Sequence, residues 1–147
     1  MRSVMGSLPA KEAEEITILD MEASIEHLTR GTVCNVDALL VVTEPYYRSL
    51  ETTGRMVPLA KELGLDRVWV VANKVRVERD EAALREYCVR RNFDIIGFVP
   101  YDEQVTEADR HGQALIDHAP TAAAVIEVER IAASILERFA AIPLSVA

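Results

Sequence analysis

The sequence predicts an α/β fold in which one parallel sheet carries helices on both faces. Short apolar runs alternate along the chain with segments of helical period, at Ile16–Leu19, Ala38–Val42, Arg67–Ala72 and Phe93–Val99. The runs are continuous rather than alternating, which is typical of strands covered on both faces of a parallel sheet. The last three begin at residues 38, 67 and 93, a spacing close to the length of a βαβ unit.

Two segments between the runs have the period of a helix. Ser49–Leu63 repeats apolar or small residues in steps of three and four, and Gly64 follows as the expected C-terminal cap. Asp80 is the expected N-cap of the next helix. The apolar stripe of that helix consists of Ala83, Leu84, Tyr87 and Cys88.

A long last helix is predicted from Pro120 or Thr121 to about Ala141, because Pro143 marks its end. Its polar positions carry both signs of charge, whereas a helix lying on a membrane surface is normally basic. We therefore expect this helix to pack against the sheet. The face expected to do so consists of Val125, Val128, Ala132, Ile135 and Phe139.

Composition limits the class of protein. The chain has 147 residues, of which 50% are hydrophobic, so one globular domain is expected. The net charge of −8 argues against a general nucleic-acid-binding surface. No apolar run is long enough to cross a bilayer and no secretory signal is recognisable, so a cytoplasmic location is expected. Cys34 and Cys88 form no metal or redox motif and are expected to be free thiols.

Asp20 follows the first apolar run directly. Open α/β sheets place their ligand chemistry at the carboxyl ends of their strands. In nucleotide-hydrolysing proteins an acid at this position holds Mg²⁺ against the phosphates. The alternative from the pattern alone is a carboxylate that caps a following helix.

The stretch after this run is more specific. Asp20-Met-Glu-Ala-Ser-Ile-Glu-His-Leu-Thr-Arg-Gly-Thr is similar to the switch II segment of the MinD/ParA-type ATPases. It most resembles the CooC-type branch, accessory ATPases for nickel insertion into carbon monoxide dehydrogenase. Val71–Val75 resembles the Asn-Lys strand end at the base site of that family, and Val99–Asp102 resembles its last nucleotide loop.

The resemblance covers residues 16–119 of a single P-loop NTPase-like domain. Residues 1–15 form a poorly matched lead-in, and residues 120–141 form the C-terminal helix. The resemblance implies ATP or ADP and Mg²⁺ as ligands. Asp20 would be the switch II acid beside the attacking water, and it would also hold Mg²⁺ through water.

The resemblance also implies a base site. Asn73 would present its side-chain amide to the adenine edge, since an amide offers both a donor and an acceptor. Lys74 would line the pocket with its alkyl stem, or alternatively be a solvated lysine. Pro100, Tyr101 and Asp102 would wrap the base mainly through backbone groups.

The sequence departs from the family pattern in three places. Ser24 replaces the usual switch II glycine, which can approach a phosphate closely. The metal-binding Cys-x-Cys pair of the CooC-type branch is absent, so nickel is only a family association. None of the six glycines lies in Gly-x-x-x-x-Gly-Lys-Ser/Thr, the loop that binds the phosphates.

Without that loop the chain is not expected to hydrolyse ATP alone, and the predicted domain is incomplete at its N-terminus. The alternative function is a non-catalytic interaction or regulatory module derived from this fold. The expected partner is a second copy or a chain that covers the missing front half, with a metalloenzyme as a possible client. No nucleic acid and no membrane are expected as partners.

Overall fold

The computed structural model describes residues 16–21 and 36–140. Its sheet has three parallel strands, in the order β1 (Leu39–Thr43), β2 (Val68–Val75) and β3 (Asp94–Pro100). These are the last three apolar runs of the sequence, each displaced by a few residues at most. The predicted parallel α/β sheet is therefore confirmed.

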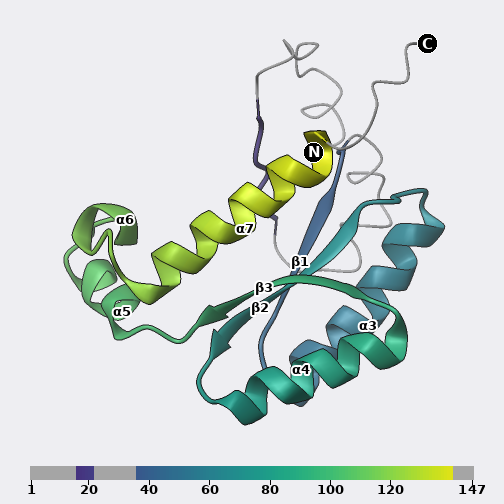
Figure 1. Ribbon diagram of the computed structural model, residues 1–147, viewed down its shortest axis with the longest axis horizontal. Coiled ribbons are helices and arrows are strands. Elements are labelled where there is room, and N and C mark those ends of the chain that lie inside the picture. Colours follow the sequence, from purple (N-terminus) through teal and green to yellow (C-terminus); the bar gives the residue numbers. More distant parts are fainter. Residues whose placement is uncertain (1–15, 22–35, 141–147) are drawn as a thin grey trace.

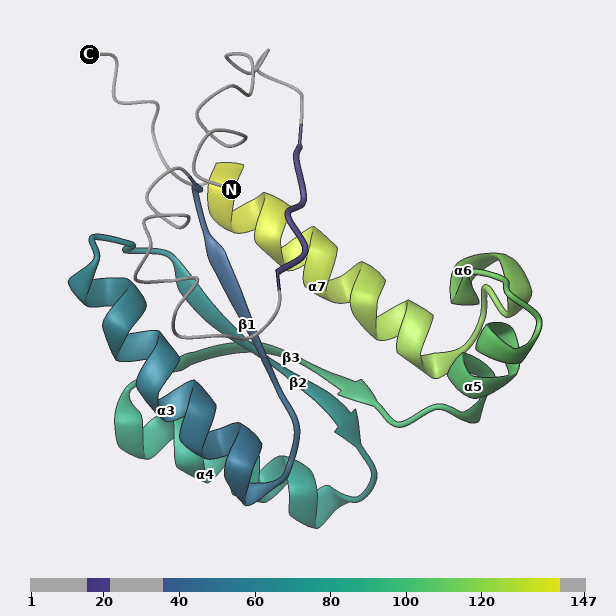
Figure 2. The same ribbon diagram turned by 180° about the vertical axis from the view of Figure 1, so that it is seen from behind.

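Helices cover both faces of this sheet (Figures 1 and 2). Helices α3 (Tyr47–Glu62) and α4 (Glu78–Arg91) pack on one face, and α7 (Ala123–Ala140) packs on the other, mainly over β3. Two short helices, α5 (Glu103–Arg110) and α6 (Leu115–His118), connect β3 to α7. The predicted three layers are present.

The main core lies between β1, β2 and α3. Val41 and Val70 face the buried side of α3, where Val57 and Ala60 are fully buried. Gly64 ends this helix with a φ of 88°, a conformation that glycine adopts without a steric penalty. The predicted helix and its C-terminal glycine are thus confirmed.

The start of α4 corrects the predicted cap. The helix begins at Glu78, with Val77 as its N-cap, and Asp80 is its third residue. The Asp80 carboxylate accepts hydrogen bonds from the backbone N–H groups of Arg76 (3.1 Å) and Val77 (3.4 Å). An acidic side chain at this third position reaches back to free N–H groups before the helix, so the predicted N-cap lies three residues too late in the chain.

The buried face of α7 also differs from the predicted stripe. Val125 is buried as expected, but Val128 is 53% exposed. Ala124 and Ile131 are buried instead, because α7 lies over β3, where Gly97 admits the Ile131 side chain. Among the described residues, no helix is long and apolar enough to cross a membrane.

The structure contradicts the predicted strand at Ile16–Leu19. This segment has no regular secondary structure, and its Ile16 and Ile18 side chains are 67% and 89% exposed. The described strands pair only with one another. A strand requires a neighbour to bond its backbone, so an apolar run without one does not become part of the sheet.

Among the described elements, helices cover strand β1 on one face only. Leu40 and Val42, which point away from α3, are 42% and 56% exposed. Trp69 and Val71, on the same side of β2, are each only 7% exposed. The continuous apolar run therefore predicts coverage on both faces correctly for β2 but not for β1.

Cys88 is a free thiol packed in the core on α4. Burial raises its pKa, which keeps it protonated and unreactive. The expectation of a free thiol is confirmed for Cys88, whereas Cys34 lies outside the described residues.

Candidate functional site

The carboxyl ends of the three strands form one edge of the sheet, where ligands bind in open α/β folds. Val75 of β2 is paired with Pro100 of β3. Asn73 and Lys74 therefore lie beside the turn that contains Tyr101 and Asp102. The structure brings together the five residues of the predicted base site at this edge.

A bulge interrupts β2 at Asn73 and Lys74. Ala72 pairs with Phe98 and Val75 pairs with Pro100, so two residues of β2 lie opposite one residue of β3. Lys74 has a φ of 57°, a left-handed conformation that costs a non-glycine residue about 1–3 kcal/mol. Its N–H donates to Oδ1 of Asn73 at 3.0 Å. Such bulges redirect side chains next to binding sites.

Lys74 connects β2 to the end of β1. Its Nζ lies 2.8 Å from Oε1 of Glu44, and the hydrogen bond and charge of Glu44 raise the pKa of Lys74. The Lys74 side chain is about half exposed, at 52%, so the pair contributes little to stability. In the structure Lys74 is thus a half-exposed lysine paired with Glu44, and its role at a base stays a prediction.

The Asp102 carboxylate is hydrogen-bonded to the starts of two helices. Its Oδ1 accepts a hydrogen bond from the backbone N–H of Gln104 (3.0 Å) and thereby caps α5. Its Oδ2 accepts from the backbone N–H of Ala124 (3.2 Å) in the first turn of α7. Both carboxylate oxygens are thus used in fixing the loop that the sequence assigned to the base.

Arg76 is a residue of this edge that the sequence analysis missed. Its guanidinium carbon lies 3.6 Å from the centroid of the Tyr101 ring, while the Tyr101 N–H donates to the Val75 carbonyl at 2.8 Å. The contact depends on the register of β2 against β3, which local sequence patterns do not determine.

Three hydroxyl groups fix the turn from β1 into α3. Oγ of Ser49 accepts from the backbone N–H of Glu44 (2.9 Å) and is bonded to Oγ1 of Thr43 (3.1 Å). Oγ1 of Thr53 donates to the Ser49 carbonyl (2.9 Å). Thr43 and Thr53 are buried, so these bonds satisfy hydroxyls that would be costly to leave unpaired.

Asp20 lies outside the sheet and is exposed. The adjacent Met21 packs against the core cluster around Val41, and the rest of the switch-like segment, with Ser24, lies outside the described residues. The role of Asp20 at Mg²⁺ therefore stays a prediction. In the part of the chain that the structure describes, no three His, Cys, Asp or Glu side chains are grouped to hold a metal ion.

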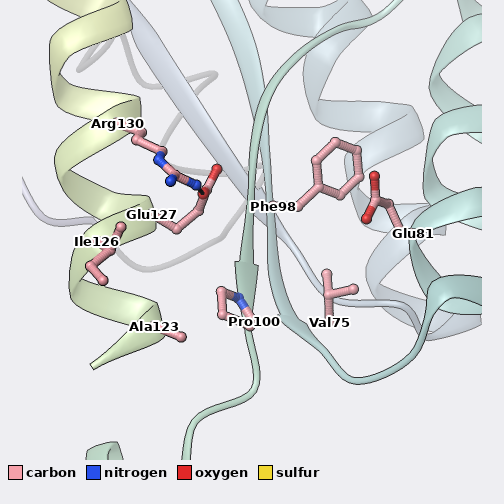
Figure 3. Close-up of a pocket in the computed structure, with 8 residues that line it drawn as sticks. All are labelled: Val75, Glu81, Phe98, Pro100, Ala123, Ile126, Glu127 and Arg130. Atoms are coloured by element: carbon pink, nitrogen blue, oxygen red, sulfur yellow. Dashed lines mark hydrogen bonds and ion pairs between the residues drawn. The ribbon is translucent and has the colours of Figure 1, made fainter. Parts of the chain in front are cut away.

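A groove of about 390 Å³ crosses the outer edge of β3 between α4 and α7 (Figure 3). Phe98 points toward Glu81 of α4, and Glu127 lies on the α7 side. Of the predicted base-site residues only Pro100 lines this groove. The groove is thus a neighbour of the candidate site and not its centre.

Comparison with known proteins identifies several relatives by sequence. No family model matches the chain. An uncharacterised ATP-binding protein of Methanocaldococcus jannaschii is 43% identical over 103 residues, covering 69% of this chain and 40% of the relative. The carbon monoxide dehydrogenase accessory protein CooC of Rhodospirillum rubrum is 35% identical over 125 residues, covering 85% and 46% respectively.

Solved structures agree in fold. A chain of the MinC:MinD cell division protein complex of Aquifex aeolicus superposes with a TM-score of 0.66 at 18% identity, covering 83% of this chain and 50% of that one. The chain spans about half the length of the curated relatives that it matches. The sequence relatives and the fold together show that the chain belongs to the MinD/ParA-type P-loop ATPase superfamily.

Proposed function

We propose that the chain binds the base of ATP or ADP at the carboxyl edge of β2 and β3. Asn73 reads the base edge through its amide, and the Pro100–Asp102 turn lies along the base. The bulge at Asn73 and Lys74 carries this proposal, because the Asn73 amide accepts a hydrogen bond from the N–H of Lys74, whose φ is positive, at the strand end next to that turn. The ATP-binding relatives support the same ligand.

The phosphate half of the site is a separate part of the proposal. Asp20 holds Mg²⁺ through water when Mg-ATP is bound, because a carboxylate suits this hard cation. The sequence contains no glycine-rich phosphate loop. The proposal therefore assigns no phosphate-loop contacts to the residues of this sequence.

Calorimetric titration with adenosine and with Mg-ATP tests the proposal. Asn73→Ala is expected to weaken both ligands roughly tenfold, since it removes a hydrogen-bonding pair to the base. Asp20→Ala is expected to weaken Mg-ATP alone. Gln104→Ala removes an exposed amide from α5 and serves as the control. The proposal is wrong if the wild-type chain binds neither ligand at millimolar concentration.

We propose as a second candidate that the chain acts as an interaction module in metalloenzyme maturation. The open face of β1, with Leu40 and Val42, favours this function, because such exposed apolar strands are normally covered by another chain. The name of the CooC relative suggests a metalloenzyme as the client.

Light scattering after size exclusion tests the second candidate. The wild-type chain is expected to elute as a dimer or with a bound partner, and Val42→Lys as a monomer. Val89→Lys, at a valine that is 78% exposed on α4, is the matched control and should leave the assembly unchanged. A wild-type chain that stays a stable, soluble monomer would contradict this candidate.

A further inference from the structure

Arg76 and Tyr101 form a stack whose two backbones are fixed. The Arg76 N–H is bonded to the Asp80 carboxylate at 3.1 Å, and the Tyr101 N–H is bonded to the Val75 carbonyl at 2.8 Å. The guanidinium carbon lies 3.6 Å from the ring centroid. The stack is therefore positioned before any ligand arrives.

The Arg76 guanidinium has no carboxylate partner within residues 16–21 and 36–140. A second arginine of the same region provides a contrast. Arg85 lies over Phe98 at 4.1 Å, but its guanidinium is also 2.7 Å from a carboxylate oxygen of Glu81. The N–H groups and the outer face of Arg76 thus remain available to a ligand.

Arg76 lies three residues beyond Asn73, at the same end of β2. Between them Val75 is paired with Pro100, so both side chains belong to the edge that holds the predicted base turn. Guanidinium planes stack well on nucleobases, and aromatic rings support such stacks. We therefore expect a planar ligand whose edge meets the Asn73 amide to reach this plane.

We propose that the Arg76–Tyr101 stack is the platform on which a purine base lies while Asn73 reads its edge. Arg76 is then a residue that determines specificity for a planar base. This inference rests on the proposed nucleotide site and adds to it the group that holds the face of the base.

Titration of the full chain with adenosine, which carries no charge, separates stacking from attraction of phosphate. Arg76→Ala is expected to weaken adenosine roughly tenfold, a value within the range for loss of one base stack. Arg76→Lys should weaken it nearly as much, because lysine keeps the charge and loses the plane. Tyr101→Phe keeps the ring and should bind as the wild type does.

Arg79→Ala is the matched control, since Arg79 is an exposed arginine in the first turn of α4. Circular dichroism is expected to show the same fold for Arg76→Ala, because Arg76 and Tyr101 are both exposed. Weakened AMP binding with unchanged adenosine binding would make Arg76 an anion contact and overturn the platform.

Two other results would also overturn the platform. If Asn73→Ala loses adenosine and Arg76→Ala does not, the base site stands and the platform alone is wrong. If the wild-type chain binds no adenosine at millimolar concentration, the proposed base site and the platform are both wrong.

Discussion

Replacing Gly97 by alanine is expected to lower the free energy of unfolding by about 1–3 kcal/mol. A Cβ at this position in β3 would meet Cγ1 and Cδ1 of Ile131 on α7. Ile131 is only 6% exposed, so a new Cβ must displace its side chain within the packed contact between β3 and α7. Alanine has less backbone entropy than glycine in the unfolded chain, which favours the folded state by about 0.5–1 kcal/mol. This gain offsets only part of the loss.

A double-mutant cycle checks the cause of this loss by denaturant unfolding. Ile131→Ala alone is expected to cost about 2–5 kcal/mol, because a buried side chain is truncated. It also removes both atoms that clash with a new Cβ. The double variant should therefore be more stable than the sum of the two losses predicts, by about 1 kcal/mol or more. Strict additivity would rule out the clash as the mechanism.

Asp102→Ala is expected to destabilise the protein by about 2 kcal/mol, roughly 1 kcal/mol for each helix start that loses its acceptor. The Asp102 carboxylate accepts from the N–H of Gln104 at α5 and of Ala124 at α7. Its negative charge also lies at two helix N-termini, which carry partial positive charge. Thermal and urea unfolding measure the change.

Two further variants separate capping from charge. Asp102→Asn keeps one oxygen acceptor and should lose about half as much stability as Asp102→Ala. Asp109→Ala removes an equal charge from the exposed part of α5 and should change stability by less than about 0.5 kcal/mol. If Asp109→Ala costs as much as Asp102→Ala, net charge and not capping determines the effect.

Local patterns were sufficient to predict the central part of the fold. The runs that became β1, β2 and β3 were visible because buried parallel strands are apolar throughout. The run at Ile16–Leu19 has the same pattern, yet it is not a strand in the structure. Whether an apolar run enters a sheet depends on a free neighbouring strand, and the run itself carries no information about that neighbour.

The residues of the candidate site were also predicted only in part. Asn73 and the Pro100–Asp102 turn were predicted from short motifs, and the pairing of β2 with β3 places them together. Arg76 on Tyr101 depends on the strand register after two irregularities in that pairing, which local patterns do not determine. The second hydrogen bond of Asp102 spans 22 residues, to Ala124, and is equally invisible in a local pattern.

The contact between α7 and β2 provides the protein with an internal optical probe. Trp69 is the one tryptophan in the sequence and is packed edge-on against Phe139 of α7, with ring centroids 5.8 Å apart. Detachment of α7 exposes this indole to water and shifts its fluorescence to longer wavelength. Trp69 lies near the start of β2, and Asn73 lies near its end. The emission of Trp69 therefore reports on the attachment of α7 independently of ligands at the opposite edge of the sheet.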